Sequence, residues 1–412
     1  MDLIIRNALM VDEKSIVDLG IKDGKFAEIA PRLEVKGGVE IDAKKKLVTP
    51  TFIDPHIHLD KILIAEVVRD NVSGTLSEAI EIIWEKKKNY TKEDIVERAS
   101  RVVEWAIKNG TTVMRTHVDV DTIGKLLPAE ALLEVKQKYA EVFDLQIVAF
   151  PQEGIIQDPG TKDLMNEAML IGCDVVGGMP YNEMTFEDSM EHIKFCFQLA
   201  KKYDRDIDMH VDETDDDTAR TLEYYAATTI KEDYKGRTSS GHTCALSSYN
   251  EYYAAKVIAL VKRAEMNMET NPATNLMLQG RRDNGRVRRG LTRVKQLMDA
   301  GVNVTFGQDC IKDTFYPTFG QADLFEVAQL LAHAAQLSLP HQVRSIMDMM
   351  TKNAAKMLRL KDYGIEVGKP ASFNIIDAPS IAEALRKRAD RLYVYKNGKL
   401  LSKTKTCTEM FI

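Results

Sequence analysis

Two histidines, His56 and His58, are the residues that most directly indicate chemistry in this sequence. They are one residue apart, at the end of a short apolar run that begins at Phe52. In a strand, residues i and i+2 point to the same face, so the two imidazoles would converge on one point. That geometry suits two ligands of one metal ion, and it also suits a pair of buried, hydrogen-bonded histidines.

Three later segments favour the metal site. His210 ends one candidate strand and is followed three residues later by Glu213, His242 ends another, and Asp309 follows the last strong strand before the C-terminal helices. A lone side chain of this kind is usually structural. Several of them at successive strand ends can meet at one edge of a sheet, where catalytic side chains of β/α barrels gather.

The middle of the chain alternates short apolar runs with amphipathic segments of helical length. Candidate strands lie at 111–114, 145–150, 174–178, 207–210 and 302–306. Apolar residues at helical spacing predict helices at 92–108, 186–203 and 320–337. Repeated strand–helix units predict an α/β protein whose parallel sheet closes into a (β/α)8 TIM-like barrel. A doubly wound sheet is the alternative, but no G-x-G-x-x-G or phosphate-binding loop follows an early strand.

Both ends of the chain contain short strand-like runs. Asp23-Gly24 and Asn397-Gly398 are hairpin signals between two such runs. Because chain termini commonly lie close together, the two ends are expected to form one unit. We therefore predict a small β-sandwich domain built from residues 1–50 and 364–412, and a barrel over residues 51–363.

Composition excludes several classes of protein. The chain has 412 residues, with 56 Lys and Arg against 62 Asp and Glu, so a net charge of −6 gives no bulk attraction for nucleic acid or an anionic membrane. No apolar run approaches the ~18 residues of a membrane span. The five cysteines are an odd number without a C-x-x-C pair, which predicts a reduced, cytoplasmic compartment. The arginines between 281 and 293 lack interleaved aromatics, so we expect them to anchor a loop or a subunit contact and not to bind nucleic acid.

Longer motifs surround the candidate site residues. They are PHIHLD at 55–60, SGTL at 73–76, RTHVDV at 115–120, LQIVAFPQEG at 145–154, HVDE at 210–213 and RGLTRVK at 289–295. Over almost the whole chain they resemble the amidohydrolase superfamily and, within it, the bacterial cytosine deaminase family. The H-x-H pair alone is weakly specific, whereas PQEG together with HVDE is specific to the cytosine deaminase branch.

The resemblance implies that His56, His58, His210 and Asp309 hold one divalent metal ion, Fe2+ or Zn2+. Such an ion lowers the pKa of bound water toward neutrality and so supplies the hydroxide that replaces an amino group. Two-metal relatives need a bridging ligand, often a lysine after the fourth strand, and residues 174–180 contain none. The H-x-E and P-C-x-x-C motifs of the unrelated zinc-dependent nucleotide deaminases do not occur either.

The same resemblance implies roles for the other site residues. Asp309 and His242 would take a proton from the attacking water, and Glu213 would protonate the ring nitrogen beside the attacked carbon. Gln152 would bind the ring edge through an amide that can donate and accept, helped by the backbone of Leu76. The partner would then be a small nucleobase, and the family implies a homo-oligomer.

The sequence departs from the family at two positions. Cys310 stands where a second aspartate is common, and Phe315 where a tryptophan is usual. Both changes would enlarge the pocket or make it less polar. We therefore hypothesise that the site accepts a cytosine with a C5 substituent, such as 5-methylcytosine, converting it to thymine and ammonia. The alternative is that Cys310 packs inertly and substrate choice is unchanged.

Other functions remain open at this point. Isoguanine, creatinine and N-alkylated triazines are substrates of related enzymes that the pocket residues do not exclude. A cyclic-amide hydrolase would favour two metals and would lack the HVDE acid and the PQEG glutamine. A non-catalytic scaffold is disfavoured by the retention of all four ligands together with Glu213 and His242.

Overall fold

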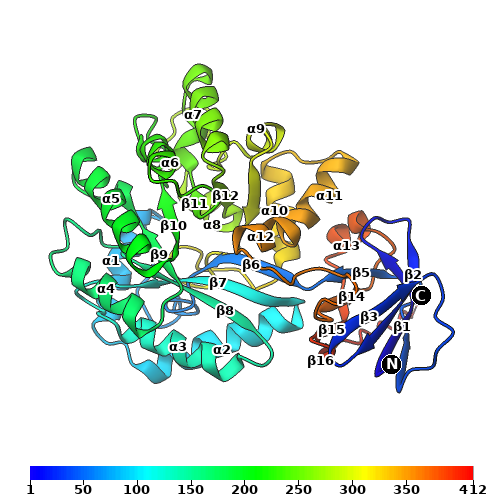
Figure 1. Ribbon diagram of the computed structural model, residues 1–412. Helices are drawn as coiled ribbons and strands as arrows, with labels where there is room; N and C mark the ends of the chain where they lie inside the picture. The colour runs from blue at the N-terminus through cyan, green and yellow to red at the C-terminus, as the bar shows by residue number, and fades with distance from the viewer. Residues whose placement is uncertain (412) are drawn as a thin grey trace.

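The computed structural model describes residues 1–411 and contains two eight-stranded sheets, which Figure 1 shows side by side. The larger is a parallel sheet in which each strand pairs with the next along the chain. Its strands are β6 (Phe52–Ile57), β7 (Thr111–Asp119), β8 (Asp144–Phe150), β9 (Val175–Gly178), β10 (Asp206–Val211), β11 (Thr238–His242), β12 (Asn267–Thr270) and β13 (Asn303–Phe306). Helices follow the strands and surround the sheet. The predicted fold class, a (β/α)8 barrel with a separate small β domain, is confirmed.

The barrel closes at the candidate metal ligands. The amide nitrogen of Asp309 donates to the carbonyl oxygen of His56 over 2.8 Å, and the amide nitrogen of His58 donates to the carbonyl oxygen of Asp309 over 3.1 Å. These bonds join the end of β6 to the segment that follows β13, with Ile57 and Asp309 as parallel bridge partners. Closure therefore brings together side chains from the first and last strands, some 250 residues apart in the sequence.

The helices are α1 (Leu76–Lys87), α2 (Lys92–Lys108), α3 (Leu127–Tyr139), α4 (Thr161–Ile171), α5 (Phe186–Tyr203), α6 (Thr221–Lys231), α7 (Glu251–Arg263), α8 (Pro272–Leu278), α9 (Val294–Asp299), α10 (Leu324–Ala334), α11 (Pro340–Met349), α12 (Lys352–Met357) and α13 (Ile381–Lys387). The predicted helices at 92–108 and 186–203 have the observed bounds of α2 and α5. Both begin after a threonine, Thr91 or Thr185, whose hydroxyl accepts a hydrogen bond from a backbone N–H of the first turn.

Two sequence-based predictions need correction. The helix predicted at 320–337 is shorter, because the carboxylate of Asp323 accepts from the backbone of Phe325 and starts α10 at Leu324. Gln336 has a positive φ of 57°, which helical backbone does not allow. The strand predicted at 111–114 continues to Asp119. The apolar run that predicts the strand stops at Met114, because polar residues follow it, although all of β7 is buried.

The second sheet joins strands from both ends of the chain. Its members are β1 (Leu3–Met10), β2 (Ile16–Lys22), β3 (Lys25–Ala30), β4 (Val39–Asp42), β5 (Leu47–Pro50), β14 (Phe373–Ile376), β15 (Arg391–Lys396) and β16 (Lys399–Lys403). β5 pairs with β1 on one side and with β14 on the other, so it links the two terminal segments in one mixed sheet. Phe26, Phe373 and Tyr395 lie in its core, and the last two rings stack with centroids 4.8 Å apart. The boundaries at residues 50 and 364 stay a prediction.

No helix within residues 1–411 is long and apolar enough to cross a lipid bilayer.

Candidate metal centre and active site

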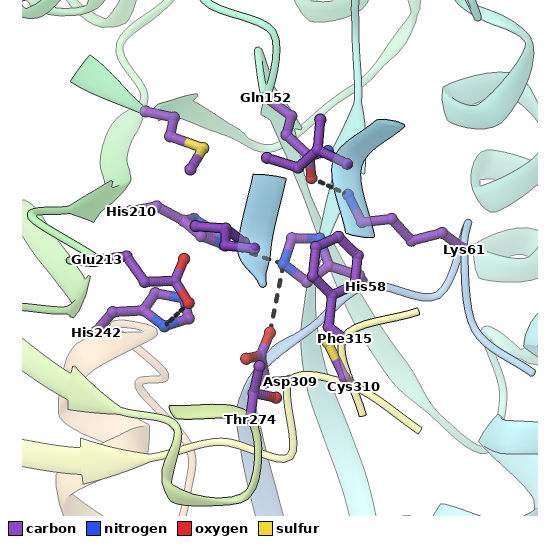
Figure 2. A pocket seen from close by; sticks show the side chains of 13 residues that line it. His58, Lys61, Gln152, His210, Glu213, His242, Thr274, Asp309, Cys310 and Phe315 are labelled. Atoms are coloured by element: carbon purple, nitrogen blue, oxygen red, sulfur yellow. Dashed lines mark hydrogen bonds and ion pairs between the residues drawn. The ribbon is translucent and has the colours of Figure 1, made fainter. Parts of the chain in front are cut away.

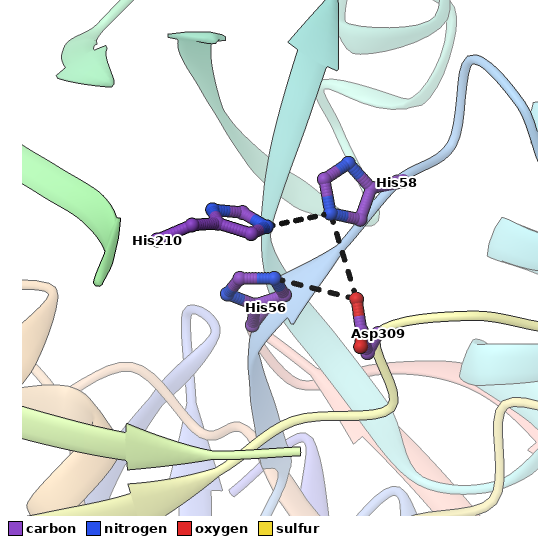
Figure 3. Close-up of side chains that lie close together, drawn as sticks. All are labelled: His56, His58, His210 and Asp309. Carbon is purple, nitrogen blue, oxygen red and sulfur yellow. Dashed lines mark hydrogen bonds and ion pairs between the residues drawn. The ribbon is translucent and has the colours of Figure 1, made fainter. Parts of the chain in front are cut away.

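The four predicted ligands converge inside the barrel, as Figure 3 shows. His56 and His58 come from the end of β6, His210 from β10, and Asp309 from the turn after β13. The Nε2 atoms of His58 and His210 are 3.0 Å apart. Oδ1 of Asp309 lies 3.4 Å from Nε2 of His56 and 3.5 Å from Nε2 of His58. All four ligand atoms lie within 4.8 Å of one another.

These distances fit a metal ion. Tetrahedral bonds of the usual length for imidazole and carboxylate would separate the ligand atoms by about 3.3 Å. Nε2 of His56 is buried and has no hydrogen-bond partner among residues 1–411, as expected of an atom that binds a metal ion. A donor set of three imidazoles and one carboxylate suits either Fe2+ or Zn2+.

Electrostatics favour the metal-binding protonation states of His58, His210 and Asp309. Burial, with the neighbouring positive charges, lowers the pKa of His58 and of His210 well below the usual value, so both imidazoles are neutral. Burial alone would raise the pKa of Asp309, but the adjacent His56 and the positive charge of His242 reverse the shift, and the net pKa is lowered. Neutral imidazoles and an ionised carboxylate are the forms that bind metals.

A buried carboxylate supports His56 from behind. Nδ1 of His56 lies 2.9 and 3.0 Å from the two carboxylate oxygens of Glu269 on β12. Although burial opposes it, this carboxylate raises the pKa of His56. An N–H from Nδ1 to a carboxylate leaves Nε2 free to bind a metal and fixes the ring orientation. Sequence analysis missed Glu269, whose only local signal is an acid inside a short buried strand.

We predict that Glu269→Gln weakens metal binding by about 10- to 100-fold, because the imidazole loses its charged support. Competition with a chelator of known affinity measures the change. Surface Glu232, which pairs with Lys201, provides the matched control, since Glu232→Gln should leave metal affinity unchanged. Equal affinities of the Glu269→Gln and native proteins would contradict this role.

Three residues at or just beyond the ends of barrel strands have strained backbone conformations. Asp212, His242 and Asp309 have φ values of 46°, 65° and 65°, in the left-handed region that residues with a Cβ rarely occupy. Asp212 is held there, since its carboxylate accepts hydrogen bonds from the backbone of Thr221 and Leu222 at the start of α6. Such strained positions often occur at functional sites, where they direct side chains away from the strand.

Glu213 and His242 form a pair beside the metal ligands. Glu213 lies two residues beyond the end of β10, outside the regular strand. Its Oε1 is 3.1 Å from Nδ1 of His242, and the carboxylate raises the pKa of His242 although burial opposes it. Asn275 lies 2.9 Å from the same His242 nitrogen and 3.3 Å from Glu213. A carboxyl and an imidazole in direct contact can pass a proton between them.

One cavity collects the predicted substrate-binding residues with the ligands, as Figure 2 shows. About 310 Å³ of space not filled by atoms lies within it and in the solvent at its opening. Its walls contain all four predicted substrate-binding side chains, which are Leu76, Gln152, Cys310 and Phe315. Glu213, His242, His58, His210 and Asp309 also line it. Lys61, Ile80, Met179 and Thr274 line it as well, and sequence analysis did not single them out.

The wall at Cys310 and Phe315 is apolar. Both belong to a buried cluster with Ile64, Ile80 and Leu278. Burial, reinforced by neighbouring carboxylates, raises the pKa of the Cys310 thiol well above its usual value, so the group is uncharged. Phe315 is held by a tight turn in which the carboxylate of Asp313 accepts hydrogen bonds from the backbone of Phe315 and Tyr316, each 2.9 Å long.

Known proteins resemble the chain along almost its full length. It superposes on the crystal structure of 5-methylcytosine deaminase from Klebsiella pneumoniae liganded with 5-fluorocytosine with a TM-score of 0.95 and 36% identity, over 99% of each chain. It is 32% identical to N-isopropylammelide isopropyl amidohydrolase of Pseudomonas sp. (strain ADP), over 98% of this chain and 97% of that protein. It is 30% identical to pterin deaminase of Rhizobium rhizogenes, over 94% of this chain and 88% of that protein.

The profile of the amidohydrolase family matches residues 39–401, which include every site residue named above. The superfamily resemblance inferred from the motifs is thereby confirmed. With a barrel that closes on three histidines and an aspartate, the chain belongs to the amidohydrolase family.

Proposed function

We propose that the protein is a metal-dependent hydrolytic deaminase of a free pyrimidine base, with 5-methylcytosine as its substrate and thymine and ammonia as products. The observation that carries the proposal is the cavity whose walls contain three of the four ligands, His58, His210 and Asp309, together with the Glu213–His242 pair and Gln152. The likeness to a 5-methylcytosine deaminase over the whole chain supports it.

The proposed chemistry divides between the metal and the side chains. His56, His58, His210 and Asp309 would hold a divalent ion, Fe2+ or Zn2+, which would supply a Lewis acid for the activation of water. Glu213 donates a proton to the ring nitrogen beside the attacked carbon, then takes the second proton of the attacking water and passes it to the amino group, which leaves as ammonia. His242 accepts the first proton from the attacking water. The contact of its Nδ1 with Glu213 fixes the orientation of the imidazole ring.

The remaining pocket residues bind the ring. Gln152 forms hydrogen bonds with the polar edge of the substrate ring. The backbone of Leu76, at the start of α1, helps to bind the same edge. Cys310 and Phe315 present an uncharged wall, and a methyl group at C5 can pack there without desolvating a carboxylate.

The proposal is tested by a screen of amino-heterocycles for ammonia release by iron- and zinc-loaded protein. We expect a higher kcat/KM for 5-methylcytosine than for cytosine, isoguanine, creatinine or N-isopropylammelide. A large advantage for plain cytosine would overturn the C5 assignment. A ring-opened product would instead identify a cyclic-amide hydrolase.

We predict that Cys310→Asp lowers the ratio of kcat/KM for 5-methylcytosine over cytosine by about tenfold or more, because a methyl group would then lie against a charged group. Cys310→Ser is the matched control, being similar in size and uncharged, and should keep the native ratio. Steady-state kinetics on both bases measure the ratios. If the two variants give the same ratio, the charge at this position does not select the substrate.

The proposal includes two properties that rest on the sequence and its family. The spread of unpaired cysteines favours a cytoplasmic protein. The family resemblance favours a homo-oligomer, which light scattering of the purified protein would reveal as a multiple of 46.4 kDa.

A further inference from the structure

A buried lysine touches the glutamine of the substrate pocket. Nζ of Lys61 lies 2.5 Å from Oε1 of Gln152 and 2.5 Å from Oδ1 of Asp119, and its side chain is 1% exposed. Figure 2 shows the lysine reaching the amide from the wall of the cavity. Lys61 follows the His58 ligand by three residues, yet neither metal binding nor proton transfer uses it.

The lysine determines how the amide is turned. An ammonium group has three donors and no acceptor, so only the carbonyl oxygen of Gln152 can face it. The amide nitrogen, Nε2, therefore points the other way. It is buried and finds no hydrogen-bond partner within the described chain, although Gln152 lines the cavity. A buried amide nitrogen without a partner is costly unless a ligand supplies an acceptor.

The lysine itself is held as a cation. Burial alone would lower its pKa, but the carboxylates of Asp119 and Asp60 outweigh burial, and the net pKa is raised. Asp119 is shared with a second buried lysine, Lys87, whose Nζ lies 2.7 Å from Oδ2. Lys87 also pairs with Asp121 and Glu153. The carboxylate that anchors Lys61 is thus itself fixed by a buried ion-pair network.

We infer that Lys61 is a positioning residue that makes the Gln152 edge of the pocket a hydrogen-bond donor, so that the site selects heterocycles with a carbonyl oxygen there and disfavours those with an amino group. The inference rests on the proposed function only in that the cavity binds a heterocycle. It replaces the expectation that the amide donates and accepts equally. A free amide could rotate to suit either group, whereas this one would have to break its contact with Lys61.

Two unreactive probes test the inference: 2-pyrimidinone, which offers a carbonyl oxygen, and 2-aminopyrimidine, which offers an amino group. Calorimetry on the metal-loaded protein should show about 30-fold tighter binding of the carbonyl probe, because the amino probe leaves the amide nitrogen unpaired. Lys61→Met should reduce the ratio to about threefold or less by freeing the amide to rotate. Lys61→Arg, which keeps a donor-only group, should retain the native preference.

Lys87→Met is the matched control. It removes a buried cation from the same Asp119 carboxylate but has no contact with Gln152, so it should lower stability and leave the binding ratio intact. If Lys61→Met does not fold, Lys61→Gln tests the same point, since its amide can both donate and accept. A native ratio in folded Lys61→Met or Lys61→Gln, or equal binding of both probes by the native protein, would overturn the inference. Because neither probe carries the 4-amino group that is lost, the proposed function can fail in the ammonia screen while this ratio stands.

Discussion

Replacing Glu213 by glutamine is expected to lower kcat on 5-methylcytosine by about 1,000-fold, within the range for loss of a positioned general acid and base. The amide has nearly the same shape as the carboxyl but cannot carry a proton to the ring nitrogen. Substrate contacts change little, so KM should stay close to the native value. Steady-state rates of ammonia release measure both constants, and metal content should be unchanged.

Two comparisons make this result specific. Glu232→Gln makes the same chemical change at a surface ion pair with Lys201 and should leave the rate unchanged. Because Glu213 is buried beside His242, thermal unfolding must show that Glu213→Gln is folded before its rate is interpreted. A folded Glu213→Gln protein with native kcat would exclude this residue as the proton carrier.

Removal of the metal is expected to have the second large effect. A Lewis acid that contributes about 5 kcal/mol to the reaction corresponds to about 5,000-fold in rate. Chelation should therefore abolish ammonia release, and added Fe2+ or Zn2+ should restore it. Asp309→Ala should have the same effect without recovery, because it removes a proposed metal ligand that is also a proposed proton acceptor.

The metal should also stabilise the fold. An ion that binds only the native state raises the free energy of unfolding, so the chelated protein should melt at a lower temperature than the loaded one. His333→Ala provides the control, because this histidine is exposed on α10 and is not one of the four ligands, so the variant should keep both metal content and melting temperature. A loaded Asp309→Ala protein with native metal content would contradict the ligand assignment.

Local patterns were sufficient for much of the fold. Apolar residues at helical spacing predict α2 and α5 with their observed bounds, because an apolar helix face is visible within one window of sequence. The prediction of β7 is too short because Arg115, Thr116 and His117 interrupt its apolar run, although these polar residues are buried. Periodicity registers hydrophobicity, so a buried polar strand gives it no signal.

The ligand residues can be predicted because their signals are local in the sequence. His56 and His58 are paired by the alternation of one strand, and His210 and Asp309 lie at strand ends within motifs that resemble the family. Glu269 gave no such signal, because its partner His56 is 213 residues away. Contacts between distant strands exist only once the barrel has closed.

By itself, the sequence determined the types of the site residues, their placement at the carboxyl ends of barrel strands and the class of reaction that they can perform. Tertiary structure alone decided how the side chains of those residues are oriented and which charges lie next to them. The Gln152 amide could face the cavity with either of its ends, and Lys61, 91 residues earlier in the chain, selects one of them. The physical reason is that the orientation of a polar side chain depends on the charge placed next to it, and that neighbour is determined by packing and not by sequence distance.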